Sequence, residues 1–238
     1  MSPPAPTPDA DRLDAIARMV PSGSVVADIG TDHGLLALRL LASRRALRCI
    51  ASEPTAARLA KARAAAAGSP HRERLTLRVG DGLHAIRPAD GVEVAVIAGL
   101  GGHAVVRILD QPARGRLALR RLVLQPQTDA GLVRRWISEH EFRHAAECLV
   151  LDRGRLYTLI AAEPGRERLS HPRLSLDDLL EAGPRLVRSR DPLVPVYWAR
   201  WLERHETILA RARPGAARDE AVRQRDLAKR VLAVLVGG

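Results

Sequence analysis

Carboxylates follow three of the strand-like segments in the first half of the chain. Asp28 precedes a turn that contains Gly30 and Gly34, Glu53 ends the next apolar segment, and Asp81 follows a third. The carboxyl ends of parallel strands meet at one edge of an open α/β sheet, and ligands bind in the crevice at that edge. Three acids in these places therefore predict a ligand-binding crevice.

The turn after the first segment reads Gly30-Thr31-Asp32-His33-Gly34. A glycine lets a ligand approach the backbone closely, and the helix that follows offers free N–H groups at its positive end. Dinucleotide-binding turns carry G-x-G-x-x-G, whereas here Asp32 occupies the middle glycine position. A carboxylate there would repel a pyrophosphate but suits the sulfonium and amino groups of S-adenosylmethionine, which we predict as the cofactor. A purely structural strand–turn–helix corner is the alternative.

The predicted cofactor contacts extend along the same edge. We expect Glu53, about 20 residues past the turn, to hydrogen-bond ribose hydroxyls, and Asp81 to hydrogen-bond the adenine amino group, although either could be a solvated loop charge. The segment Gly99-Leu100-Gly101-Gly102 carries three glycines in four residues, which implies backbone close to a ligand. The predicted cofactor-binding residues are Asp28, Gly30, Thr31, Gly34, Glu53, Asp81, Gly82 and Gly99.

Alternating apolar segments and helical patterns must position these residues. Strands are predicted at 25–29, 47–52, 75–79, 92–98, 119–124, 145–151 and 156–162, and helices at 9–20, 33–44, 55–67, 102–109 and 129–140. The inner strands are continuously apolar, as parallel strands covered on both faces are. Only Asp152-Arg153-Gly154-Arg155 joins the last two strands, a hairpin connection too short for a parallel pair. The predicted fold is α/β and Rossmann-like: a class I methyltransferase sheet, parallel with a terminal antiparallel hairpin.

Three regions are expected along the chain. Residues 1–8 are predicted to be a disordered lead-in, residues 9–163 the methyltransferase domain, and residues 164–238 a small helical domain. In that last region two helical stretches, 195–212 and 216–235, are joined by Arg213-Pro214-Gly215, which stops a helix. We expect them to form an antiparallel, coiled-coil-like pair.

The charge balance points to a polyanionic partner. The chain has 36 Arg and 2 Lys against 27 acidic residues, a net charge of +11. A basic surface favours nucleic acid, although an Arg-rich composition throughout the chain would give the same excess. No signal peptide, membrane-length apolar run or Cys/His metal spacing is evident, so a cytoplasmic protein without metal is expected, and its oligomeric state is left open.

The motifs together resemble the bacterial tRNA (adenine-22-N1)-methyltransferase family, TrmK. The resemblance lies in Asp28-Ile29-Gly30-Thr31-Asp32-His33, Val96-Ile97-Ala98-Gly99-Leu100-Gly101-Gly102 and Leu124-Gln125-Pro126. Arg12-Leu13, Arg134-Arg135-Trp136 and Tyr157 also fit, and the likeness continues more weakly into the helical tail. It implies methyl transfer to N1 of an adenine in the D-arm region of tRNA, with tRNA as the partner.

Roles for individual side chains follow as hypotheses. Asp32 is expected to stabilise positive charge developing on the adenine, with His33 as its partner, although Asp32 could instead cap the helix and His33 be an ordinary loop histidine. Substrate contacts are expected from Leu100, Gly101, His103, Arg12, Arg39 and Arg44. The alternatives are a methyltransferase acting on another RNA, a small molecule or a protein, a non-catalytic RNA-binding protein, and an NAD-dependent oxidoreductase.

Overall fold

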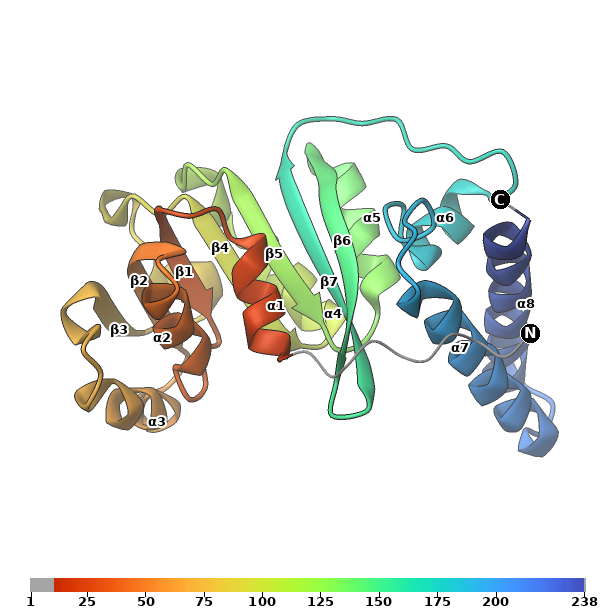
Figure 1. Ribbon diagram of the computed structural model, residues 1–238, viewed down its shortest axis with the longest axis horizontal. Coiled ribbons are helices and arrows are strands. Elements are labelled where there is room, and N and C mark those ends of the chain that lie inside the picture. The colour runs from red at the N-terminus through yellow and green to blue at the C-terminus, as the bar shows by residue number, and fades with distance from the viewer. Residues whose placement is uncertain (1–10, 238) are drawn as a thin grey trace.

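The computed structural model describes residues 11–237 and has a single twisted sheet of seven strands at its centre (Figure 1). The strands are β1 (Ser24–Ile29), β2 (Ala46–Glu53), β3 (Leu75–Val79), β4 (Val94–Leu100), β5 (Arg121–Pro126), β6 (Phe142–Asp152) and β7 (Arg155–Pro164). Their order in space is β3-β2-β1-β4-β5-β7-β6. The strands β2 and β3 therefore extend the sheet on one side of β1, and β4 then pairs with β1 on its other side. The order in which strands are added reverses at this point.

Strand direction confirms the predicted arrangement. The first five strands pair in parallel, whereas β7 pairs antiparallel with both β5 and β6. The turn at Arg153-Gly154, where both residues have positive φ, closes the β6–β7 hairpin. The sheet is thus the doubly wound class I methyltransferase sheet expected from the short hairpin connection.

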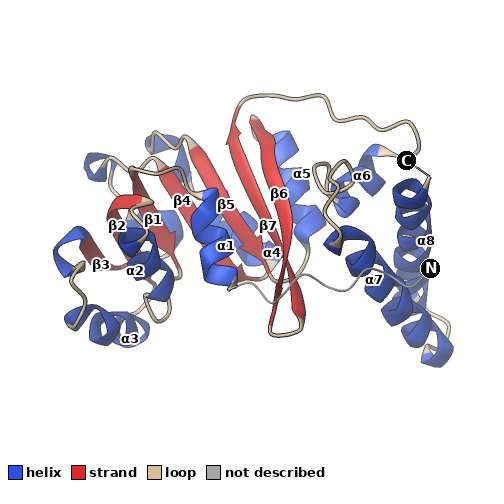
Figure 2. Ribbon diagram, viewed as in Figure 1, coloured by secondary structure: helices blue, strands red, loops and turns tan. Residues whose placement is uncertain are grey.

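Helices cover both faces of this sheet (Figure 2). On one face pack α1 (Arg12–Met19) and α2 (Leu35–Ala42), and on the other pack α4 (Gly102–Leu109) and α5 (Ala130–Glu139). Successive buried residues of β4 alternate between the two faces, so both sides of the strand must be apolar. Helix α3 (Ala56–Ala67) lies beside β2 and β3 at the edge of the sheet.

The C-terminal part is helical and packs beyond β6. It contains α6 (Leu176–Ala182) and the long pair α7 (Leu193–Arg211) and α8 (Ala216–Val236), which run side by side at one end of the molecule (Figure 1). A third apolar core joins these helices to Leu149 and Leu151 of β6. A buried ion pair adds a polar anchor, because Arg134 Nε of α5 lies 2.6 Å from Glu147 Oε1 of β6. The other end of the Arg134 guanidinium donates to the carbonyls of Leu180 and Glu181.

Several element boundaries differ from the sequence prediction for local reasons. Helix α2 begins at Leu35 rather than at residue 33, because Asp32 and Gly34 adopt the left-handed conformation with φ of 46° and 70°. Helix α1 begins at Arg12, where Asp11 caps it by accepting from two backbone N–H groups. Helix α6 was not predicted, although Ser175 caps it and two aspartates fill its first turn. The predicted lead-in at residues 1–8 lies outside the described residues.

Candidate active site

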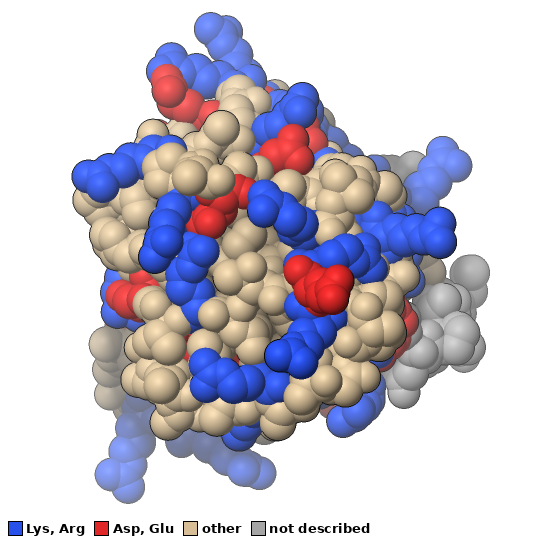
Figure 3. Space-filling view, turned by 90° about the vertical axis from the view of Figure 1, so that its left-hand side faces the viewer, with Lys and Arg blue, Asp and Glu red and all other residues tan. Residues whose placement is uncertain are grey.

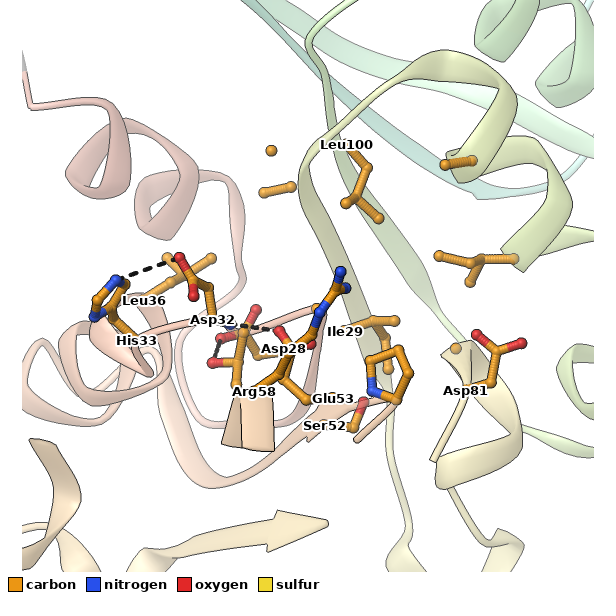
Figure 4. Close-up of a pocket in the computed structure, with 18 of the residues that line it drawn as sticks. Asp28, Ile29, Asp32, His33, Leu36, Ser52, Glu53, Arg58, Asp81 and Leu100 are labelled. Carbon is orange, nitrogen blue, oxygen red and sulfur yellow. Dashed lines mark hydrogen bonds and ion pairs between the residues drawn. The ribbon is translucent and has the colours of Figure 1, made fainter. Parts of the chain in front are cut away.

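A cavity of about 850 Å³ opens at the carboxyl ends of β1, β2, β3 and β4 (Figure 4). This is the edge of the sheet at which the sequence predicted a crevice. The cavity brings together eleven of the predicted site residues: Arg12, Asp28, Gly30, Thr31, Asp32, His33, Glu53, Asp81, Gly82, Gly99 and Leu100. Because they come from five different elements, only the folded chain assembles this site.

Two buried carboxylates form the floor of the cavity. Asp28 and Glu53 are 2% and 4% exposed, on the neighbouring strands β1 and β2. Burial raises the pKa of Asp28 to about 6, the Thr31 hydroxyl opposes that shift by donating at 2.6 Å, and the nearby Glu53 charge adds to it. No cationic side chain among the described residues forms an ion pair with either carboxylate. The floor of the cavity therefore suits a ligand that carries a positive charge.

The turn after β1 is held in place by Glu53. The backbone N–H of Asp32 donates to Glu53 Oε1 at 2.6 Å, which fixes Asp32 in its left-handed conformation. The Asp32 side chain is 65% exposed, and its two carboxylate oxygens lie 3.5 Å from His33 Nε2 and 3.6 Å from Lys61 Nζ. Asp32 does not cap α2, since Gly34 occupies the N-cap position. The Asp32 carboxylate is thus exposed at the cavity, with His33 and Lys61 as its neighbours.

A glutamine that the sequence analysis missed supports the opposite side of the cavity. Gln111 Nε2 donates to Asp81 Oδ2 at 3.3 Å, while its Oε1 accepts from the backbone N–H of Leu83 at 2.7 Å. Gly82 has φ of 56°, and a Cβ there would lie 2.5 Å from Gln111 Oε1. Glycine is therefore required at this position both by the backbone conformation and by the packing of Gln111. Gln111 holds Asp81 at the edge of the cavity, across from Glu53 (Figure 4).

The fourth side of the site is built around Gln125, which is fully buried in β5. Its Oε1 accepts from the backbone N–H of Gly99 at 3.2 Å and from Arg12 Nη1 at 2.5 Å. The Arg12 guanidinium also lies over the Tyr157 ring, 4.8 Å from its centroid. Arg12 is consequently fixed at the mouth of the cavity, and Gly99, with φ of 79°, keeps the backbone open beside Leu100.

Three predicted residues serve roles outside the cavity lining. A Cβ at Gly34 would lie 3.1 Å from the Ala62 Cβ, so this glycine allows α2 to pack on α3. Gly101 is the N-cap of α4 and faces the Thr128 hydroxyl. His103 lines a second cavity, beside the first one.

Two of the predicted substrate contacts, Arg39 and Arg44, lie away from the cavity. Arg39 of α2 is paired with Asp11 at 2.6 Å and with Asp14 at 3.1 Å, so its guanidinium joins α2 to α1. Arg44 lies in the turn before β2, at the opposite end of that strand from the cavity. Neither residue lines the cavity that holds the other predicted contacts.

Basic residues that the sequence analysis did not single out line the same cavity. Arg58 and Lys61 lie one turn apart on α3, and Arg107 reaches the cavity from α4. The signal for the first two was their i, i+3 spacing on the helix that follows Glu53. Figure 3 shows Lys and Arg side chains spread over the end of the molecule that carries α2 and α3, with acidic ones between them.

Neither a membrane-spanning helix nor a metal site is found in residues 11–237. No helix there is long and apolar enough to cross a membrane. Nor does any group of three His, Cys, Asp or Glu side chains in that range have the arrangement of a metal site.

Known proteins of similar sequence and structure include several described as tRNA m1A22 methyltransferases. The tRNA (adenine(22)-N(1))-methyltransferase family profile matches residues 26–235. The Bacillus subtilis protein of that description is 28% identical over 197 residues, which are 83% of this chain and 82% of the relative. The solved structure of the B. subtilis m1A22 tRNA methyltransferase TrmK aligns with a TM-score of 0.81 and 26% identity, covering 94% of this chain and 98% of that one.

A second solved structure was determined with a ligand. Streptococcus pneumoniae Sp1610 in complex with S-adenosyl-L-methionine aligns with a TM-score of 0.82 and 28% identity, and covers 94% of this chain and 99% of that one. The profile spans both the sheet and the C-terminal helices, as do these alignments. The chain therefore belongs to the tRNA (adenine(22)-N(1))-methyltransferase family.

Proposed function

We propose that this protein transfers a methyl group from S-adenosylmethionine to N1 of an adenine at position 22, in the D-arm region of tRNA. The observation that carries the proposal is the acid-floored cavity at the strand ends, in a chain whose family profile has this description. The reaction belongs in the cytoplasm, where tRNA is modified.

The residues present fit the predicted cofactor. Asp28 is buried with no cation against it in the described part of the chain, and an amino or sulfonium group would offset the cost of that charge. Glu53 retains a second oxygen, Oε2, for ribose hydroxyls, while Asp81 at the far side suits an exocyclic amine. A nicotinamide dinucleotide fits less well, because its pyrophosphate would meet Asp32 beside the turn.

When bound, S-adenosylmethionine supplies an electrophilic methyl group. The adenine N1 lone pair forms the new bond to carbon, the carbon–sulfur bond breaks, and its electron pair stays on sulfur. This nucleophile needs no activation, so the main work of the chain is to align the two partners. We assign Asp32 to stabilise the positive charge that develops on the base and then to accept the N6 proton, with His33 beside it.

The pairing edge of the adenine must be free, so the base is unpaired or flipped out of its helix. We assign Gly99 and Leu100 to the side of the cavity that receives it, and Arg12 to the RNA at the cavity mouth. The remaining basic residues contribute to tRNA binding through long-range attraction.

The test is methyl transfer from labelled S-adenosylmethionine to tRNA, followed by nucleoside analysis. We expect 1-methyladenosine in a tRNA with adenine at position 22 and none in the matched tRNA that carries guanine there. Label at another nucleoside, or equal label in both tRNAs, would reject the assigned target. Calorimetry with S-adenosylmethionine and with NAD tests the cofactor independently of RNA.

A further inference from the structure

A second cavity of about 370 Å³ lies between the end of β5, the N-terminus of α5 and the C-terminal helices α7 and α8. Four aromatic side chains contribute to its lining, Tyr157 from β7 and Tyr197, Trp198 and Trp201 from α7. Gln127 lines both this cavity and the methyl-transfer cavity, so the two are neighbours. An RNA that reaches the first cavity therefore passes close to the second.

Apart from His103, the charged side chains of this second cavity are acidic, in a chain with a net charge of +11. Its lining includes Asp129, Glu181 and Glu220, and no Lys or Arg of the described residues contributes to it. A phosphate group would be repelled there. Aromatic walls with polar edges are instead the surroundings in which proteins hold unpaired nucleobases.

Most polar groups in the cavity already have partners. Trp201 Nε1 donates to Gln224 Oε1 at 3.2 Å, and Gln224 Nε2 donates to Glu220 Oε1 at 2.8 Å. Glu220 also pairs with Arg223, and Asp129 accepts from a neighbouring threonine hydroxyl at 2.7 Å. The Trp201, Gln224 and Glu220 side chains thus form one hydrogen-bonded chain that needs no ligand.

Two groups of the lining matter for a ligand, one acceptor and one donor. The Glu181 side chain is exposed, and its carboxylate makes no hydrogen bond or ion pair with residues 11–237; partial burial raises its pKa, while the charges of Arg134 and Arg135 oppose that shift. The Trp198 side chain is 3% exposed, and its Nε1 has no partner in the same part of the chain. A buried donor without a partner is costly, and a polar ligand atom within its reach would offset that cost.

Gly131 explains how the Glu181 carboxylate is accommodated. An ideal Cβ at residue 131 would lie 2.3 Å from the Glu181 carboxylate, so a larger residue there would push the carboxylate out of its present position. Gly131 is in the first turn of α5, where alanine would be the better helix former. The space is therefore kept at the expense of helix propensity.

We propose that this cavity binds a second unpaired base of the tRNA, a guanine, stacked on the aromatic side chains with its pairing edge on Glu181. Guanine presents a ring N–H and an amino group side by side, which match the two oxygens of one carboxylate. Uracil presents carbonyls there, and adenine and cytosine place a ring lone pair beside the amino group, which the second oxygen would repel. The same mismatch excludes the adenine that is methylated, whose N1 lone pair must face the methyl donor. This inference rests on tRNA being the substrate.

The first test is fluorescence titration of the full chain with guanosine in saturating S-adenosylmethionine, which occupies the cofactor part of the first cavity. Trp198 and Trp201 lie in the second cavity and report stacking, whereas Trp136 lies in the apolar core under the sheet. We expect saturable quenching by guanosine and at least tenfold weaker binding of adenosine and uridine. Saturable binding of adenosine or spermidine in preference to guanosine, or no saturable quenching, would overturn the proposal.

Two variants perturb the same carboxylate in different ways. Glu181→Gln removes one acceptor, and Gly131→Ala displaces the carboxylate while keeping its charge. Both should weaken guanosine binding and raise KM for tRNA about tenfold, the discrimination that a bidentate base contact gives, with kcat and S-adenosylmethionine affinity unchanged. Gly131→Ala should melt no lower than the parent chain, which separates lost binding from lost folding. Unchanged guanosine affinity in both variants would refute the assignment. Loss of S-adenosylmethionine binding by the parent chain would instead count against the proposed function.

Discussion

Replacing Asp28 by Asn should stabilise the protein without its cofactor while weakening cofactor binding. Burial raises the pKa of Asp28 from 3.8 to about 6, so the folded state holds its proton more tightly than the unfolded state does. Such a group contributes its stabilisation below the unfolded pKa and loses it as the pH rises through the folded pKa. The ionised carboxylate thus costs stability at neutral and higher pH.

The size of the effect follows from the pKa difference of about two units. At 1.36 kcal/mol per unit, the penalty at pH 8 is about 3 kcal/mol, and at pH 5 it is about half of that. The Asn side chain keeps an oxygen that can accept from the Thr31 hydroxyl, so that hydrogen bond survives the change. The variant should therefore exceed the parent chain in stability by roughly these amounts at the two pH values.

Urea unfolding at pH 5 and pH 8 measures the stability difference, and calorimetry with S-adenosylmethionine measures binding. We expect the parent chain to bind the cofactor more tightly as the pH rises through about 6, and the variant to bind at least tenfold more weakly with a flatter pH dependence. Asp81→Asn, at an exposed acid of the same cavity, is the matched control and should not reproduce the gain in stability, because it removes no buried charge. An Asp28→Asn variant that is no more stable than the parent at pH 8, or whose gain is equal at both pH values, would refute the reasoning.

Three further predictions concern other parts of the molecule. Asp32→Ala should abolish methyl transfer to tRNA while S-adenosylmethionine affinity by calorimetry stays within about tenfold, roughly 1.4 kcal/mol, because its carboxylate is exposed toward the substrate; retained turnover would reject the role. Arg134→Met should lower the free energy of unfolding by about 3–5 kcal/mol, because it leaves the buried Glu147 carboxylate without its ion-pair partner. Adding Glu147→Leu should restore part of the lost stability. A loss under about 1 kcal/mol in urea unfolding, as for an exposed ion pair, would contradict this argument. Arg12→Ala should raise KM for tRNA severalfold at low salt with kcat less affected, and an unchanged KM would remove it from the RNA interface.

The sequence predicted the sheet because local patterns carry that information. The four-residue connection at Asp152–Arg155 was enough to identify an antiparallel pair, and the acids at Asp28, Glu53 and Asp81 marked the ligand edge once the strands were taken as parallel. The resemblance of the Asp28–His33 turn to a family then supplied the reaction, which composition and periodicity alone could not.

Contacts between distant residues were beyond sequence reasoning. Gln111 supports Asp81 from 30 residues away, and Arg12 reaches Gln125 across 113 residues. Nor does the sequence show whether a basic residue near the site is available to bind RNA. Arg39, for example, forms ion pairs with Asp11 and Asp14. No periodicity reports such pairings, because they depend on which helices meet in the folded chain.

The space above Gly131 has a consequence for how this family diverges. A side chain at residue 131 would enter the space that the Glu181 carboxylate occupies, so the residues at these two positions depend on each other. In homologues with a larger residue at position 131, we expect the acid at position 181 to be absent or to point elsewhere. In homologues without the acid, position 131 no longer has to be glycine. If the residues at these two positions vary together across homologues, the C-terminal helices take part in RNA recognition.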